Sequence, residues 1–127
     1  MIMITVKKLS QSGILIIAFL LFHFGCVTEP DIENYPEVSF LNDITPILSS
    51  NCSQSGCHGA VNPEEFTLIT YEDVMRYVKV GNARESKLYQ AITDRGDEFM
   101  PPSPSSPLSD QQISTILVWI EQGAPNN

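Results

Sequence analysis

The sequence "NCSQSGCHGA", residues 51–60, holds two of the three cysteines of the chain and one of its two histidines. Cys57 and His58 are adjacent, and the four residues Ser53 to Gly56 separate Cys57 from Cys52. Two thiols and an imidazole this close together are typical of a covalently attached cofactor, a disulfide or a metal site. The fold of a chain this small depends on which of these the stretch forms.

The adjacency of Cys57 and His58 is the demanding part of a haem-attachment motif, whose common form is Cys-x-x-Cys-His. Haem carries two vinyl groups along one edge, and each can form a thioether with a cysteine. A histidine directly after the second cysteine is tethered so that its imidazole reaches the iron. The gap between the cysteines only has to bridge the vinyl groups, and Gly56 allows a longer gap to bulge outward. The four-residue gap is therefore compatible with haem.

The first 25 residues are typical of an export signal. Lys7 and Lys8 give a basic start, and the continuous apolar run Ile14 to Phe22 follows them. The run is shorter than the roughly 18 apolar residues that a membrane-spanning helix needs, and an uncleaved anchor is the alternative interpretation. Gly25 directly before Cys26 resembles the exit of a bacterial lipoprotein signal, which implies that Cys26 carries lipid.

The chain after the signal is acidic. It holds all 15 acidic residues but only five basic ones. This excess disfavours nucleic acid as a partner and favours a protein with a basic docking surface, although acidity can also simply keep a small domain soluble. Residues 26–39 form an acidic, proline-containing segment and predict a solvated tether, which leaves residues 40–127 as the domain.

Two other interpretations of the cysteine stretch remain open. Cys52 and Cys57 can form a disulfide, which export favours, but this leaves the adjacent His58 unexplained. The three residues can instead bind zinc. A structural zinc site needs four ligands, and no other cysteine or histidine follows Cys26, so a carboxylate such as that of Asp43 would have to complete the set.

Met75 and Met100 are the methionines that follow the signal. Met75 lies within an expected helix, where a role in core packing is favoured. Met100 lies in the loop sequence "DEFMPPSP", where Pro101 and Pro102 stiffen the chain and bias Met100 toward an extended backbone. Such a loop can hold a thioether against an iron, and the alternative is an ordinary gap-filling methionine.

Four helical segments and no strand are predicted. Apolar spacing predicts a helix that begins near Thr45 with Pro46 in its first turn. The second covers residues 70–78, with its first residue as the cap, and the third covers residues 84–93.

The fourth helix, over residues 109–123, has the strongest pattern. Ser109 and Gln112 form a capping-box pattern, and Gly123 supplies the stop. Trp119 lies beside an apolar stripe at helical spacing. The stripe consists of Ile113, Ile116, Leu117 and Ile120.

Together these segments resemble a small bacterial c-type cytochrome domain, in particular the planctomycete-type domains that often have the four-residue gap. The pattern runs from "ITPILSSNCSQSGCHG" through "YEDV", "SKLY" and "MPP" to "PLSDQQISTILVWIEQGAPNN" and covers residues 40–127. The resemblance implies an all-α, cytochrome c-like fold of about four short helices around one covalent haem c. It also implies thioethers at Cys52 and Cys57, a proximal iron ligand at His58 and a distal ligand at Met100.

The resemblance further implies a mono-haem electron carrier rather than an enzyme, and no separate catalytic site stands out. We expect redox proteins as partners and a location outside the cytoplasm, on the periplasmic or cell-surface side of a bacterial membrane, anchored by lipid or by the signal segment. Two other functions remain open. A haem protein whose iron Met100 leaves open can sense gas or react with peroxide, and a disulfide-stapled lipoprotein domain needs no haem.

Apolar residues near the cysteine stretch and the Met100 loop are expected to exclude water from the site. They are Ile47, Leu48, Phe66, Leu68, Phe99 and Leu108.

Overall fold

Helix α5, Asp110–Glu121, is the longest element of the computed structural model, which describes residues 31–127. Its N-terminus has the predicted capping box. Ser109 Oγ accepts a hydrogen bond from the backbone nitrogen of Gln112 at 3.3 Å, and Gln112 Oε1 accepts one from the backbone nitrogen of Ser109 at 2.9 Å. Gly123 follows the helix with a φ of 98°, a conformation that suits glycine. The predictions for this helix are confirmed.

Helix α2, Thr45–Asn51, begins where the sequence predicts, with Pro46 in its first turn. Proline is favourable there because the first amides of a helix have no partner within the helix. A π-helical turn, η2, precedes it over Phe40–Ile44. The chain therefore enters the helix through a wider turn that the sequence pattern did not predict.

Helix α3, Tyr71–Met75, is shorter than the predicted range of 70–78. Thr70 and Asp73 form a full capping box at its start, so the predicted cap is correct. Its end differs because the next amides bond three residues back rather than four. Tyr77 N donates to the carbonyl of Val74 at 3.0 Å, which closes the helix in a tight turn.

The predicted helix over residues 84–93 is divided in two. A 3₁₀ turn, η3, covers Ala83–Glu85, and helix α4 covers Lys87–Thr93. Between them Ser86 is extended and buried. Its hydroxyl accepts a hydrogen bond from Lys79 N at 2.8 Å and donates one to the carbonyl of Asn82 at 2.8 Å. These tertiary bonds hold Ser86 out of the helix, so the prediction of one continuous helix is wrong.

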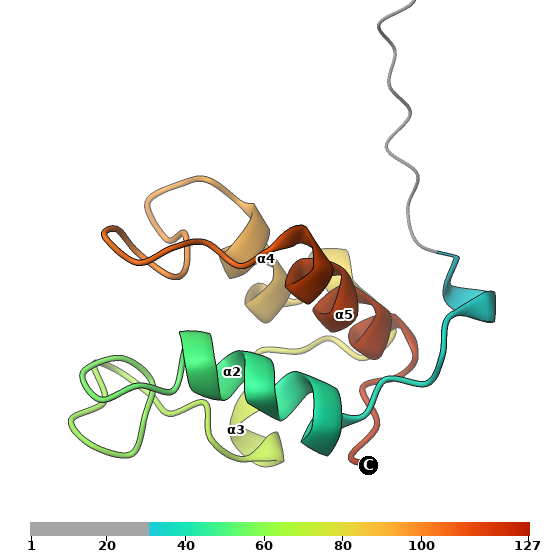
Figure 1. Ribbon diagram of the computed structural model, residues 1–127, viewed down its shortest axis with the longest axis horizontal. Helices are drawn as coiled ribbons and strands as arrows, with labels where there is room; N and C mark the ends of the chain where they lie inside the picture. The colour runs from blue at the N-terminus through green and yellow to red at the C-terminus, as the bar shows by residue number, and fades with distance from the viewer. Residues whose placement is uncertain (1–30) are drawn as a thin grey trace, which may run out of the picture.

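Helices α2 and α3 lie on one side of the domain and α4 and α5 on the other (Figure 1), with α4 packed on α5 and the turn η2 packed on both α2 and α5. Residues 31–127 contain no strand, which confirms the all-α prediction for the described part of the chain. In that part no helix has both the length and the apolar character that crossing a bilayer requires.

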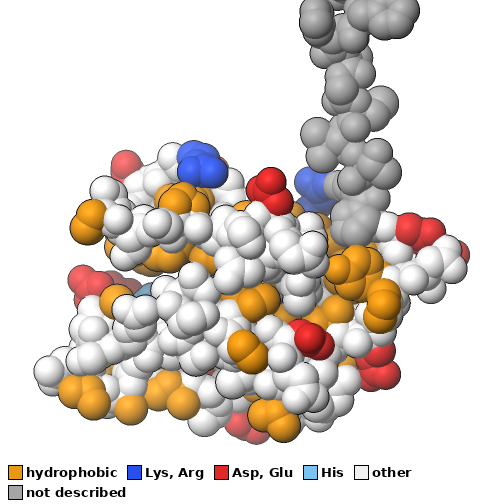
Figure 2. Space-filling model, viewed as in Figure 1, with side chains coloured by type: hydrophobic (Ala, Val, Ile, Leu, Met, Phe, Trp, Pro, Cys, Tyr) orange, Lys and Arg blue, Asp and Glu red, His pale blue; other side chains and the backbone are white. Residues whose placement is uncertain are grey.

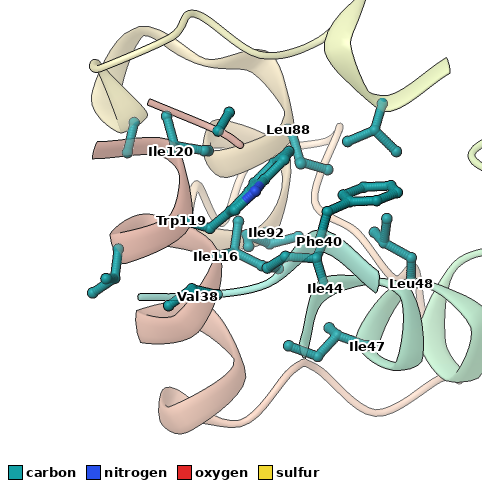
Figure 3. Packing of buried hydrophobic residues seen from close by; sticks show 14 of the residues in the cluster. Val38, Phe40, Ile44, Ile47, Leu48, Leu88, Ile92, Ile116, Trp119 and Ile120 are labelled. Atoms are coloured by element: carbon teal, nitrogen blue, oxygen red, sulfur yellow. The ribbon is translucent and has the colours of Figure 1, made fainter. Parts of the chain in front are cut away.

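Trp119 lies in the core between the helix pairs and is fully buried (Figure 3). Its indole nitrogen donates to the carbonyl of Pro125 at 3.0 Å, so its polar atom is satisfied. The ring of Phe40 lies 5.6 Å from it, and Ile116 and Ile120 of α5 are also fully buried. Trp119 therefore forms part of the core rather than its edge.

The last residues of the expected tether are packed against the domain. Val38 is buried, and its backbone nitrogen donates to Gln122 Oε1 at 2.9 Å. Gln122 Nε2 in turn donates to the carbonyl of Pro36 at 3.1 Å, and Ser39 Oγ donates to the carbonyl of Asn127 at 2.8 Å. The prediction of a solvated tether is therefore wrong at Val38, which is buried, whereas Pro36 and Glu37 are exposed as expected, although Gln122 binds the carbonyl of Pro36.

A short 3₁₀ turn, η1, precedes this segment at Ile32–Asn34. The expected export signal and the lipidation residue Cys26 lie outside the described residues.

Candidate haem-binding pocket

Two long loops project from the same end of the molecule, one after α2 and one between α4 and α5 (Figure 1). A pocket of about 340 Å³ lies between them. Figure 2 shows a hollow at that end, with acidic and histidine side chains visible inside it. The four candidate residues Cys52, Cys57, His58 and Met100 all line this pocket. The fold thus brings Met100 to the cysteine stretch from a distant part of the sequence.

The two cysteines of the pocket have different surroundings. Cys52 caps the C-terminus of α2 and is buried, whereas Cys57 is exposed on the loop, and both are free thiols. Burial, with a smaller contribution from the nearby Cys57, raises the pKa of the Cys52 thiol from 9.0 to about 11. Cys52 is therefore the less reactive of the two thiols near neutral pH.

Backbone and side-chain contacts fix His58. Its backbone nitrogen donates to the carbonyl of Cys52 at 3.0 Å. Its ring nitrogen Nδ1 lies 3.1 Å from the carbonyl oxygen of Phe66. A carbonyl oxygen can only accept, so Nδ1 carries the proton, and in the neutral ring Nε2 keeps its lone pair. This is the form in which an imidazole binds a metal through Nε2.

Gly59 allows the loop to close tightly behind His58. A Cβ at this position would lie 2.5 Å from the backbone oxygen of Ser53 and 2.7 Å from that of Gln54. A side chain there would therefore collide with the backbone of the four-residue gap. Within the gap Gly56 has a φ of 79°, which is the conformational freedom expected of it.

Met100 is held by the loop between α4 and α5. Its backbone nitrogen donates to the carbonyl of Ala91 at 2.7 Å, which turns the loop back onto the end of α4. Pro101 after it is buried, and Pro102 lines the pocket with it. Met75, by contrast, packs against the hydrophobic core, as predicted.

The apolar wall that the sequence predicts for the pocket is not present. Ile47, Leu48, Leu68 and Leu108 belong to the buried core, and none of the six predicted residues lines the pocket itself. The ring of Phe99 instead lies under the guanidinium of Arg95 at 4.7 Å. The pocket is instead lined by polar residues, such as Asn51 at the end of α2 and Gln54 and Glu64 on the loop after it, together with Met100, Pro101 and Pro102 of the facing loop.

The structure gives no support to the zinc interpretation. The carboxylate of Asp43 accepts a hydrogen bond from Ser39 N at 2.8 Å in the first turn of η2. Within residues 31–127, no three histidine, cysteine or acidic side chains are grouped closely enough to hold a metal ion. The disulfide interpretation requires a bond that the free thiols of Cys52 and Cys57 do not form here.

The donor set fits a covalent haem: two free thiols and an imidazole with Nε2 available lie on one loop, and a thioether lies on the facing loop. Comparisons with protein-family models, with curated proteins and with solved structures each found no match. The residues of this pocket are therefore the feature of the molecule that points to a function.

Sequence reasoning missed two features of the site. Phe66 was expected only as an apolar wall residue, yet its carbonyl oxygen is the partner of the His58 ring. No local pattern identifies such a partner, because it depends on how the loop returns. Gly59 has no role of its own in the quoted stretch "NCSQSGCHGA", and its place directly after His58 is the available signal for the close backbone approach.

Proposed function

We propose that this protein is a mono-haem c-type cytochrome that transfers electrons outside the cytoplasm. The observation that carries the proposal is that Cys52, Cys57, His58 and Met100 line one pocket. The two thiols and the imidazole come from the end of α2 and the loop after it, and the thioether comes from the facing loop between α4 and α5. The cytochrome c-like fold is part of the same proposal.

In this proposal each residue has one role. Cys52 and Cys57 would hold the haem covalently through their sulfur atoms, and His58 would hold the iron through Nε2, with its other ring nitrogen bound to the carbonyl of Phe66. Met100, on the facing loop, would supply the second protein ligand of the iron through its thioether sulfur. A bound haem would supply a one-electron couple, and a methionine–histidine pair favours the ferrous state more than two histidines do.

Partner and location belong to the proposal as well. The two loops that border the pocket form its rim and carry exposed acidic residues, Glu64 and Glu65 on one loop and Asp97 and Glu98 on the other, of which Glu64 lines the pocket itself. Such a rim attracts a redox partner with a basic docking surface, and this attraction weakens as salt rises. Export and anchoring to a bacterial membrane through Cys26 follow from the lipoprotein-like signal.

The proposal is tested by replacing Met100 in protein expressed with a haem-maturation system. We expect Met100→Ala to abolish the far-red methionine–iron absorption band of the oxidised protein and to allow carbon monoxide to bind the reduced form. Met75→Leu is the matched control, because Met75 packs against the core. This control is expected to keep the band.

Three results would contradict the proposal in different ways. A coloured wild-type protein that lacks the band and binds carbon monoxide would favour an open haem site for gas or peroxide. A band that survives Met100→Ala would assign the distal ligand elsewhere. Colourless protein with Cys52 joined to Cys57 would favour the disulfide-stapled lipoprotein.

A further inference from the structure

Three aromatic rings stack in series beside the pocket. The ring of His58 lies 4.3 Å from that of Phe66 with 19° between their planes. The ring of Phe66 lies 4.4 Å from that of Tyr77 with 27° between the planes. The rings come from three separate segments: the cysteine loop, its returning limb and the turn after α3. They form one column that links the loop to the helical part of the domain.

Phe66 holds the His58 imidazole in two independent ways. Its carbonyl oxygen accepts the hydrogen bond from Nδ1, and its ring covers one face of the imidazole. The hydrogen bond fixes the position of one ring atom but leaves rotation about that contact. Stacking restrains this rotation, because turning the ring separates the two faces. The plane of the imidazole is therefore defined only when both contacts are present.

The ring of Tyr77 stacks against that of Phe66, and hydrogen bonds fix the backbone of Tyr77. Tyr77 N donates to the carbonyl of Val74 at 3.0 Å, and the carbonyl of Tyr77 accepts from Leu88 N at 3.0 Å. These bonds join it to the end of α3 and the start of α4. Tyr77 is partly buried and packs against the hydrophobic core. The far end of the column is thus fixed by the helices.

We propose that Phe66 and Tyr77 are positioning residues that hold the His58 ring in one plane, so that Nε2 faces the pocket in one orientation. The consequence for an iron bound there rests on the proposed function. The positioning itself does not, because the contacts belong to the protein alone. The column explains how a loop can hold the imidazole of His58 in one place before anything binds to it.

The first experiment uses the full chain in detergent, produced without haem maturation and with isotope-labelled histidine. Nuclear magnetic resonance should show the ring protons of His58 shifted upfield by the face of Phe66, with a single ring conformation. A His58→Gln variant assigns these signals, because His23 is the other histidine of the chain. We expect Phe66→Leu to remove the upfield shift and Phe66→Tyr to keep it. Unchanged His58 signals in Phe66→Leu would overturn the proposal.

The second experiment uses the haem-loaded full chain and electron paramagnetic resonance of its ferric form. We expect Phe66→Leu to broaden and shift the low-spin signal, because the imidazole plane is no longer fixed, and Phe66→Tyr to restore it. Tyr77→Phe keeps the stacked ring and serves as the matched control for Tyr77→Leu. A ferric spectrum that Phe66→Leu leaves identical to wild type would overturn the positioning role.

The two experiments separate the two proposals. A chain that takes up no haem would contradict the proposed function, while the first experiment would still decide the positioning role. If Phe66→Leu does not fold, Tyr77→Leu decides it in the same measurement, because Phe66 then remains in place. We expect additional His58 ring conformations in Tyr77→Leu, and a single conformation identical to wild type would overturn the role of Tyr77.

Discussion

Gly59 directly follows the site histidine, at a point where the chain has no room for a side chain. The two oxygens that a Cβ would meet, on Ser53 and Gln54, are backbone atoms and cannot rotate away. We therefore expect Gly59→Ala to displace the cysteine loop and to lower the free energy of unfolding by about 1–3 kcal/mol. Urea unfolding measures this loss, and the yield of covalent haem should fall with it.

Gly96 provides the matched control for this substitution. It lies in the facing loop, and a Cβ there would meet no atom within 4 Å. Gly96→Ala is expected to leave stability and haem yield nearly unchanged. If the two variants have the same free energy of unfolding, the described close approach of Gly59 to the backbone of Ser53 and Gln54 is wrong.

The two pocket thiols are expected to differ in reactivity when the protein is produced without haem. With a pKa of about 11 in place of 9.0, Cys52 has about 100-fold less thiolate than an unperturbed thiol at pH 8. Cys57 is exposed. We expect iodoacetamide to modify Cys57 first and Cys52 at least tenfold more slowly, measured by peptide mass spectrometry.

Unfolding in urea supplies the control for the thiol measurement. Burial is the main cause of the raised pKa of Cys52, so the difference between the two thiols should disappear when the chain unfolds. Equal rates in the folded protein, or a rate difference that persists in urea, would contradict the described burial of Cys52.

The roles and conformations of single residues could be predicted from the sequence where they depend only on neighbouring residues. The adjacency of Cys57 and His58 and the capacity of Gly56 for a positive φ are both readable without a fold. The contact of His58 with the carbonyl of Phe66 could not be predicted from the sequence. It joins two parts of one loop, and no short sequence pattern specifies the path of that loop. Met100 lines the pocket, and its role as a distal ligand stays a prediction from the resemblance.

Among the elements, α5 offers the clearest test of a helix cap. Ser109 Oγ accepts a hydrogen bond from the backbone nitrogen of Gln112, and this bond satisfies an amide that has no partner within the helix. We expect Ser109→Ala to lower the free energy of unfolding by about 1 kcal/mol. Ser109→Asp is the control, because its carboxylate can accept the same bond. A loss that is equal in both variants would contradict the capping role.

The elements also show where local patterns stop being sufficient. Thr70 and Ser109 cap their helices as predicted, because a cap involves residues only three positions apart. The break at Ser86 was missed, because its cause is a hydrogen bond from Lys79 N, which lies on the other side of a turn. Helix propensity at residues 84–93 was overridden by this tertiary contact.

For the whole molecule, the packed segment of residues 36–39 makes a further prediction. The side chain of Gln122 accepts from Val38 N and donates to the carbonyl of Pro36. We expect Gln122→Ala to release the segment, at a cost of about 1–3 kcal/mol for these two hydrogen bonds. Hydrogen exchange at the Val38 amide should accelerate, and limited proteolysis should cut the segment sooner.

Gln111 is the matched control on the same helix. It is exposed, and its side-chain amide donates to the hydroxyl of Tyr35 at 3.3 Å rather than to the backbone of the segment. Gln111→Ala is expected to leave the Val38 amide protected. The same acceleration in both variants would show that Gln122 does not hold the segment.

We propose that haem is attached covalently through Cys52 and Cys57. Two measurements on the purified, export-matured chain under denaturing conditions test this attachment: its mass and its absorption spectrum. The account predicts that haem colour and mass remain with the peptide that contains both cysteines. Double substitution of these cysteines by serine should remove both signals. A wild-type chain that is colourless at the mass of the polypeptide alone would contradict the account.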